Sequence, residues 1–233
     1  MTNELPVGDP VDKPQIAPTP EPGIREGEHV LLQPVDPDRD ALLLYACSHG
    51  SPDVEALWTY MGYGPFTSES EMRSWLATCS ETADPLFLTV VSQSTSTPVG
   101  MVSYLNIVPD AWRLELGHIW YSPAVQRSRV NTEAVYLMLR ESFETLGYRR
   151  VEWKCDALNA RSRAAALRLG FQFEGIFRQH LIYKGRNRDT AWFAMLDTDW
   201  PSIKPNVERW LYQNEDGSLS LTDLNAPSDS YPR

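Results

Sequence analysis

Cysteine is scarce in this 233-residue sequence, and its three cysteines, Cys47, Cys79 and Cys155, lie far apart. They form no CxxC pair and no cluster with ligand spacing, so the sequence predicts neither a disulfide framework nor a metal site. A low and odd cysteine count is typical of a reducing compartment. We therefore expect a cytoplasmic protein.

Long apolar runs are also missing. No stretch is long enough to span a bilayer, so we expect no membrane partner. The first residues show no basic region followed by an apolar run, so no signal peptide is predicted. The content of hydrophobic residues is nevertheless an ordinary 42%. This composition favours a globular domain with a sizeable core.

Positive charge is in deficit, with 21 Lys and Arg against 31 Asp and Glu and a net charge of -10. A protein that binds nucleic acid by neutralising phosphates needs the opposite balance, so no nucleic-acid partner is predicted. An acidic surface is compatible with an amine substrate. Many acidic proteins, however, use their charge for solubility alone.

Composition divides the chain into three parts. Residues 1–27 hold six prolines between Pro6 and Pro22, which predicts an extended N-terminal arm. Residues 28–204 alternate between strand-like and helix-like patterns and predict one domain. Residues 205–233 are polar and rich in Ser and Asp. They predict a C-terminal tail, within which Trp210 and its neighbours could dock a short element.

Hydrophobic periodicity within 28–204 predicts an α/β fold. Strands are expected over 29–35, 85–93, 98–108, 112–121 and 149–156, with a final antiparallel pair within 171–185 and 188–197. Helices are expected over 38–49, 68–81, 132–147 and 159–170. The order strand, loop, helix, strand from 112 to 156 implies a right-handed crossover between parallel strands. We therefore expect a mixed sheet of six or seven strands with helices on both faces.

Alternation along 112–121 assigns side chains to the two faces of that strand. Leu114, Leu116, His118 and Trp120 are expected on one face, and Glu115, Gly117 and Ile119 on the other. His118 is then interpreted as a core histidine. Its alternative role is that of a catalytic base, because a histidine titrates near neutral pH.

The segment "SPAVQRSRVNTEA" (Ser122–Ala134) lacks glycine where it is expected. It leads from a strand into a helix N-terminus, where free backbone N–H groups and the helix dipole favour a phosphate. Glycines usually serve there because the backbone must approach the ligand closely. Two arginines and an asparagine stand here instead. From these residues alone, phosphate binding and a solvated loop are equally open.

The segments "ELGHIWYSP", "QRSRVNTEA" and "DALNARSRAAALRLGF" resemble, in this order and spacing, the GNAT acetyltransferase superfamily. The resemblance is to the branch that holds ribosomal-protein N-terminal acetyltransferases and their small-molecule-modifying relatives. It covers about residues 29–200 and is most specific over 113–178. It implies a GNAT fold and acetyl-CoA as co-substrate.

The resemblance also assigns the cofactor contacts. In the family the loop follows the pattern Gln/Arg-x-x-Gly-x-Gly/Ala and holds the pyrophosphate of acetyl-CoA. Gln126 matches the first position, whereas Arg129 and Asn131 replace the two small residues. Arg129 is expected to supply charge instead of close backbone approach, and Arg127 to reach the 3′-phosphate. The full set of expected cofactor contacts is Ile119, Trp120, Tyr121, Gln126, Arg127, Ser128, Arg129, Val130, Asn131, Thr132, Asn159 and Ser162.

Two residues are predicted to be catalytic from their match to the family. Glu115 is the expected general base, since a partly buried carboxylate has a raised pKa that suits proton abstraction. The alternatives are a solvent-facing glutamate and one that binds the substrate ammonium. Ser162 is the expected proton donor to the sulfur, with Tyr183 as its alternative. The backbone N–H of Ile119 is expected to polarise the thioester carbonyl.

Acceptor binding is assigned to Trp58 and Tyr60, together with Glu115 and His118. A basic run that includes Lys184, Arg186 and Arg188 is either solvated surface or a site for CoA phosphates or for an acidic group of the substrate. The predicted function is an acetyl-CoA-dependent N-acetyltransferase that acts by direct attack on the amine of a small molecule. The alternatives are a protein N-terminal acetyltransferase and a non-catalytic acyl-CoA sensor. A homodimer, with the N-terminal arm crossing between subunits, is left open.

Overall fold

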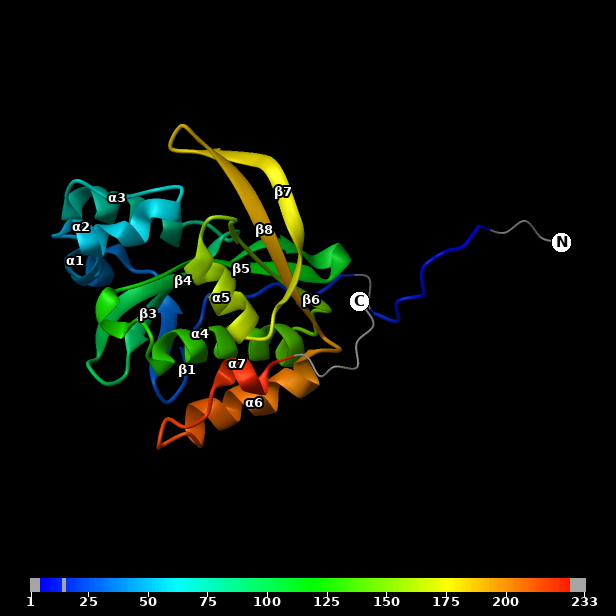
Figure 1. Ribbon diagram of the computed structural model, residues 1–233. Coiled ribbons are helices and arrows are strands. Elements are labelled where there is room, and N and C mark those ends of the chain that lie inside the picture. The colour runs from blue at the N-terminus through cyan, green and yellow to red at the C-terminus, as the bar shows by residue number, and fades with distance from the viewer. Residues whose placement is uncertain (1–4, 14–15, 227–233) are drawn as a thin grey trace.

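An eight-stranded mixed sheet organises the computed structural model, which describes residues 5–13 and 16–226 (Figure 1). The strands are β1 (Arg25–Glu26), β2 (Val30–Pro34), β3 (Leu86–Ser92), β4 (Thr97–Val108), β5 (Arg113–Tyr121), β6 (Arg150–Asp156), β7 (Gln172–Tyr183) and β8 (Arg186–Leu196). They lie in the order β1-β2-β3-β4-β5-β6-β8-β7. Only β5 and β6 pair in parallel among these neighbours.

Helices cover both faces of the sheet. They are α1 (Pro37–Ser48), α2 (Pro52–Glu55), α3 (Glu69–Ser80), α4 (Arg129–Arg140), α5 (Ala160–Arg168), α6 (Trp200–Tyr212) and α7 (Leu221–Leu224), with a 3-10 segment at Ala56–Tyr60. In Figure 1, α1 to α3 lie on one side of the sheet and α4, α6 and α7 on the other. The predicted mixed α/β fold is confirmed. The sheet has one strand more than expected because β1 forms within the predicted N-terminal arm and pairs with β2.

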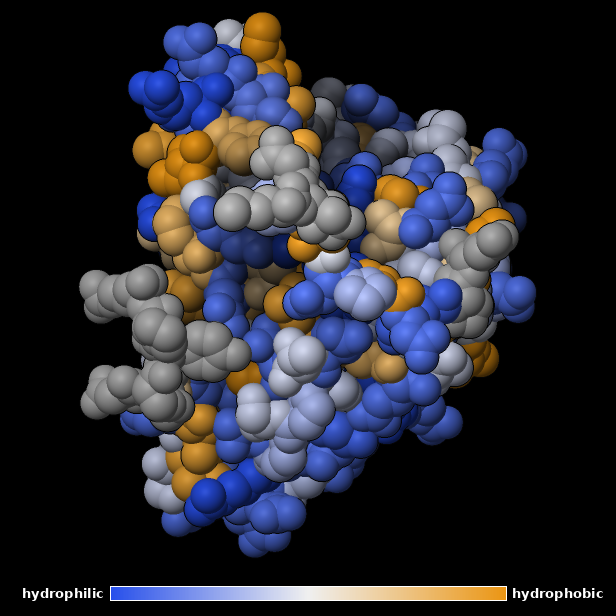
Figure 2. Space-filling view, turned by 90° about the vertical axis from the view of Figure 1, so that its right-hand side faces the viewer, coloured by the Kyte–Doolittle hydropathy of each residue, from blue (hydrophilic) through white to orange (hydrophobic). Residues whose placement is uncertain are grey.

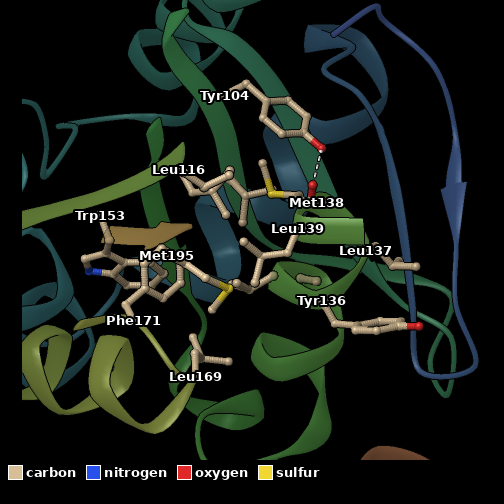
Figure 3. Packing of buried hydrophobic residues seen from close by; sticks show 14 of the residues in the cluster. Tyr104, Leu116, Tyr136, Leu137, Met138, Leu139, Trp153, Leu169, Phe171 and Met195 are labelled. Carbon is tan, nitrogen blue, oxygen red and sulfur yellow. Dashed lines mark hydrogen bonds between the residues drawn. The ribbon is translucent and has the colours of Figure 1, made fainter. Parts of the chain in front are cut away.

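Each face of the sheet has its own hydrophobic core. On the α4 side, Leu116, Trp153 and Phe171 belong to one buried cluster with Met138 and Leu139 of α4, and the Tyr104 hydroxyl donates to the Met138 carbonyl at 3.2 Å (Figure 3). On the α1 and α3 side, the core is built around the fully buried Trp58 and includes Trp120. Burial of such large side chains on both faces is the main stabilising contribution to the sheet.

The C-terminal part forms helices where a tail was predicted. The boundary expected between residues 204 and 205 falls inside α6, which buries Val207 and Leu211. Tyr212 donates to Glu133 of α4 at 2.9 Å, and Glu133 also accepts backbone N–H groups from the start of β2. A short element around Trp210 was left open, but a helix over 200–212 was not predicted, because Pro205 lies within it and an internal proline usually breaks a helix. Residues 227–233 of the predicted tail lie outside the described residues.

A bulge in β5 changes which residues share a face. The pairing between β4 and β5 shifts between Ser103↔Gly117 and Met101↔Trp120, and His118 adopts a left-handed φ of 50°. Leu116 therefore faces the α4 core, whereas Trp120 faces the α1 and α3 core. The prediction that alternation continues through residue 120 is wrong, because one extra residue inverts every position beyond the bulge.

His118 at the bulge lies in an aromatic layer beneath α3. Its Nδ1 is 3.2 Å from the Tyr63 hydroxyl, and its ring centroid is 4.8 Å from that of Phe87. Burial lowers the pKa of His118 to about 4. The imidazole is therefore neutral at physiological pH, and it is a weak base.

The described residues lack a helix that combines the length and apolarity needed to cross a bilayer. On the face drawn in Figure 2, hydrophilic residues predominate and hydrophobic ones form separate patches.

The pKa of His118 makes folding sensitive to acid. Between pH 6.5 and about 4, the unfolded chain binds a proton at His118 that the folded chain does not bind. Stability is therefore lost as the pH falls through this window, by about 3 kcal/mol from this residue. The variant His118→Asn keeps a residue that tolerates left-handed φ, and we expect a flatter dependence of unfolding free energy on pH. Urea titrations from pH 7 to 4 measure it; equal slopes in both proteins would contradict the assignment.

Candidate active site

A cavity opens where β5 and β6 separate. Their parallel register runs from Arg113↔Arg150 to Leu116↔Trp153 and then stops. Beyond that point β5 stays paired with β4, and β6 stays paired with β8. The β5–β6 cavity, of about 220 Å³, lies at this separation. Its walls come from the segment 57–63, from β5 and β6, from the start of α5 and from the β7–β8 hairpin.

Glu115 lines this cavity and is only 5% exposed. One of its carboxylate oxygens accepts from Asn106 Nδ2 at 2.6 Å and lies 2.9 Å from Lys154 Nζ. Burial raises the pKa of Glu115 above its ordinary value, although Lys154 and Asn106 act in the opposite direction. The residue is a buried carboxylate that gains a proton more readily than usual, which suits a general base.

Lys154 joins Glu115 to a second carboxylate. Its Nζ also lies 3.1 Å from Glu152 and 3.8 Å from the centroid of the Trp192 ring. Burial raises the pKa of Glu152, but hydrogen bonds and charge from Arg150 and Lys154 lower it by more, so the result is below the ordinary value. Two neighbouring carboxylates therefore differ in proton affinity, and Glu115 is the one that binds a proton more readily.

Ile119, Trp120 and Tyr121, the three strand residues assigned to the cofactor, follow the bulge, and their side chains lie in different surroundings. Ile119 lines the cavity at the point where β5 has no β6 partner in the register. Trp120 lies in the opposite core, against Trp58, with ring centroids 4.9 Å apart. Its side chain is therefore not directed to the cavity, and this part of the prediction is corrected. Tyr121 is buried toward α4, and its hydroxyl has no partner among the described residues.

The loop before α4 has a different geometry from the one its glycine-poor sequence suggested. Positive φ occurs at Arg127, at 62°, whereas Arg129 is the first residue of α4 and Asn131 lies within the helix. Neither replaced position needs a left-handed backbone, so glycine is not required there for conformation. Gln126 donates to the Tyr121 carbonyl at 3.2 Å and holds the loop against β5.

The residues at the start of α4 fit a pyrophosphate. Ser128 caps only the Val130 N–H, and no carboxylate of the described residues forms an ion pair with Arg127 or Arg129. Arg129 donates to the Asn214 carbonyl at 2.6 Å, so the C-terminal segment holds its guanidinium. The exposed Arg127 is thus the freer cation. Thr132 accepts from Arg168, a cation that sequence reasoning did not consider, at 3.0 Å.

Asn159 and Ser162 lie together at the start of α5, and both line the cavity. The Asn159 side chain accepts the Ser162 N–H at 3.1 Å, so it caps the helix. The Ser162 hydroxyl accepts from the Trp153 indole at 3.0 Å. Tyr183, the alternative proton donor, lines the cavity from the β7–β8 hairpin.

The predicted acceptor residues are divided between the cavity and the core. Tyr60 lines the cavity and donates to the Leu158 carbonyl at 3.3 Å. His118 also lines it. Trp58 does not: it is fully buried, and its indole donates to the Ser48 carbonyl at 3.1 Å. The prediction for Trp58 is therefore wrong, because its large ring is used to fill the α1 and α3 core.

Sequence reasoning missed two polar residues of the site, Asn106 and Lys154, and left the role of a third, Arg188, open. Asn106 reaches Glu115 only because β4 and β5 pair irregularly between Leu105 and Val108. Lys154 reaches it across the parallel register. Arg188, for which solvated surface and an anion site were both left open, lines the cavity from β8. Within the described part of the chain, no group of three or more His, Cys, Asp or Glu residues is arranged to hold a metal ion.

Known proteins are similar to this chain in sequence and in fold. Residues 29–172 match the family model described as "Acetyltransferase (GNAT) domain". The crystal structure of a GCN5-related N-acetyltransferase from Brucella melitensis is 37% identical, with a TM-score of 0.88 over 92% of this chain and 99% of that one. A GNAT-family protein from Chromobacterium violaceum ATCC 12472, described as a probable acetyltransferase, is 38% identical, with a TM-score of 0.77 over 86% of this chain and 100% of that one.

One curated protein also matches. YdaF of Bacillus subtilis (strain 168), whose name marks it as a candidate ribosomal N-acetyltransferase, is 29% identical over 105 residues. The match spans 45% of this chain and 57% of that protein's length. The family model spans more than half of this chain, and the Brucella protein is similar along nearly its whole length. The separated parallel strands, the bulge beside them and these matches lead to one conclusion: the chain belongs to the GNAT acetyltransferase family.

Proposed function

We propose that the chain is an acetyl-CoA-dependent N-acetyltransferase whose acceptor is the amine of a small molecule. The observation that carries this proposal is Glu115, a buried carboxylate with a raised pKa beside the separated strands, in a cavity that opens next to it. Acetyl-CoA supplies the acetyl thioester. The three cysteines are unpaired, which supports a reducing, cytoplasmic location.

Glu115 is proposed to take the proton from the acceptor ammonium, directly or through one water. The free amine can then attack the thioester carbonyl without an acyl-enzyme. Lys154 and Asn106 hold the Glu115 carboxylate in place, so little reorganisation is needed at the moment of proton transfer. His118 is less suited to this step because its pKa is about 4.

Ile119 and Ser162 are proposed to act on the thioester. The Ile119 N–H donates to the carbonyl oxygen as negative charge develops there. When the carbon–sulfur bond breaks, the electron pair goes to the sulfur, which takes a proton from the Ser162 hydroxyl. The Ser162 oxygen then regains a proton, through water, from the positively charged nitrogen of the tetrahedral intermediate, which becomes the neutral amide. Ser162 is suited to this because its oxygen already accepts from Trp153, which leaves its own proton to donate. Tyr183 is the alternative donor.

The shape of the cavity favours a small acceptor. Lys184 of the β7–β8 hairpin donates to the Trp58 carbonyl at 2.9 Å, and Tyr60 is bonded to the loop before α5. These contacts join the segment 57–63 to the β7–β8 hairpin and to the loop before α5, and the cavity between these walls is only about 220 Å³. A protein N-terminus is the second candidate acceptor, supported by the name of the Bacillus relative. A non-catalytic sensor is less favoured, since Arg129 and Asn131 have helical backbones that do not need glycine.

The variant Glu115→Gln tests the proposed base. We expect kcat to fall about 100-fold or more, since a general base contributes on that order. In the wild-type enzyme, kcat/KM should decrease as the pH is lowered, because the Glu115 carboxylate must be ionised to accept a proton. The midpoint of this decrease should lie above pH 4.5, since the pKa of Glu115 is raised. Free-thiol release measures turnover, and calorimetry with acetyl-CoA checks that binding is retained. Unchanged turnover in the variant would rule out Glu115 as the base.

The variants Arg127→Gln and Arg129→Gln test the phosphate loop. Arg127 has no recorded partner within the described residues, so its loss should raise the Kd for acetyl-CoA about tenfold. The loss of Arg129 should have a smaller effect, because its guanidinium is engaged by the Asn214 carbonyl. The exposed Arg149→Gln is the matched control. If the Arg127 variant binds acetyl-CoA as tightly as the control, the loop does not hold phosphates through this residue.

A further inference from the structure

Arg188 is a buried cation in the wall of the β5–β6 cavity. It lies on β8 and is 8% exposed. The strand pairing places Lys154 opposite Trp192, and alternation along β8 puts Arg188 on the same face. This is the face away from α4, because Ala191 and Phe193 belong to the core on the α4 side. Arg188 therefore shares the face on which Glu115 and Lys154 lie.

Arg188 has no counter-charge within the described residues. Its Nε is buried with no hydrogen-bond partner, and no carboxylate there lies within ion-pair distance. Its recorded contact is with the Tyr183 ring, whose centroid is 4.6 Å away. Lys154 in the same cavity differs, because it is held by both Glu115 and Glu152. Asp156 also lines the cavity, yet it forms no ion pair with Arg188.

A buried guanidinium without an anion is costly, and an anionic ligand would offset that cost. The planar fork of arginine is matched by the paired oxygens of a carboxylate or a phosphate. Tyr183 keeps the guanidinium against its ring, which limits its freedom before a ligand arrives. The cavity thus holds a proton acceptor, Glu115, and a separate unpaired cation, Arg188.

We propose that Arg188 binds a carboxylate or phosphate of the acceptor, so that the acceptor is a small amine that also carries an acidic group. This inference rests on the proposed function, in which the amine of the acceptor is directed to Glu115. It excludes polyamines and simple aliphatic amines as preferred acceptors, since they place no anion at Arg188. The phosphates of acetyl-CoA are not the expected ligand, because the loop at the start of α4 lies on the other face of the sheet.

The first test needs no turnover. The melting midpoint is measured with millimolar glycine, glutamate and phosphoethanolamine, and with spermidine and glycinamide as probes without an anion. At least one acid-bearing amine should raise the midpoint of the wild-type protein, because binding to the folded state stabilises it. The shift should be lost in Arg188→Gln and kept in Arg186→Gln, which removes an exposed charge from the same hairpin. Midpoint shifts with spermidine alone, or equal shifts in both variants, would overturn the proposal.

The second test uses the best acceptor of a screen by free-thiol release. Arg188→Gln should raise the KM for an acid-bearing acceptor about 30-fold or more, and Arg188→Lys should restore part of the loss. The KM for the matched amide and the Kd for acetyl-CoA should change less than about twofold, since neither involves this cation. A large rise in the Kd for acetyl-CoA would instead assign Arg188 to the cofactor.

The two tests separate the inference from the proposed function. If the wild-type protein neither binds nor turns over acetyl-CoA, but its Arg188-dependent thermal shift persists, the transferase proposal fails and the anion site stands. If turnover is present and the best acceptor is a polyamine with a KM that does not depend on Arg188, the anion site fails and the transferase stands. The thermal shifts also distinguish the two anions. A larger shift with phosphoethanolamine would indicate a phosphate, and a larger shift with glycine or glutamate would indicate a carboxylate.

Discussion

The parallel pairing of β5 and β6 ends at Leu116 and Trp153, and the candidate site exists because of this ending. Farther along, each strand follows a different antiparallel neighbour, so the sheet opens between them. The bulge at Gly117 and His118 inverts the faces of β5 at the same place. Past the bulge, β4 and β5 approach closely: at Gly100 a Cβ would collide with the Trp120 carbonyl oxygen. The bulge and the end of the parallel pairing therefore occur together. They determine where the cavity lies and place Ile119 beside it.

The charges around this opening give two of its carboxylates, Glu115 and Glu152, different pKa values. Glu115 and Glu152 share Lys154, but Glu152 also has Arg150 at 2.9 Å. The second cation keeps Glu152 ionised, whereas burial prevails at Glu115 and raises its pKa. A lysine shared in this way orients Glu115 without fixing it permanently in the charged form. Arg188 adds a cation that the described residues leave unbalanced.

Much of the architecture could be predicted from the sequence, because long periodic segments report burial directly. The strands at 85–93 and 98–108 and the helix at 68–81 lie within a few residues of their observed bounds. Glu115 was found through its resemblance to the family, on a strand that the pattern also predicts. The bulge was not found, since an inserted residue changes no composition and leaves the pattern plausible on either side. For the same reason Trp120 was expected at the site. Trp58 was expected there only because of its place in the segment before residue 66, and both residues fill the α1 and α3 core.

The polar neighbours of Glu115 and the unpaired state of Arg188 depend on contacts between strands that are distant in sequence. In the sequence, Lys154 is only one polar position in an alternating strand. Its proximity to Glu115 follows from the parallel register of β6 with β5. Arg188 belongs to a basic run that is otherwise exposed, and only the packing of the β7–β8 hairpin buries it. Helix α6 was not predicted over its full length because Pro205 lies inside it. Tertiary packing decides these cases, and local pattern carries little information about it.

A crystal structure of the chain with acetyl-CoA would show whether the cofactor binds where the parallel strands separate. We expect the acetyl thioester to lie between β5 and β6 beyond Leu116 and Trp153, with its carbonyl oxygen within hydrogen-bond distance of the Ile119 N–H and Glu115 facing the acyl carbon. Acetyl-CoA bound elsewhere, or a thioester on the far side of the sheet from Glu115, would contradict this expectation.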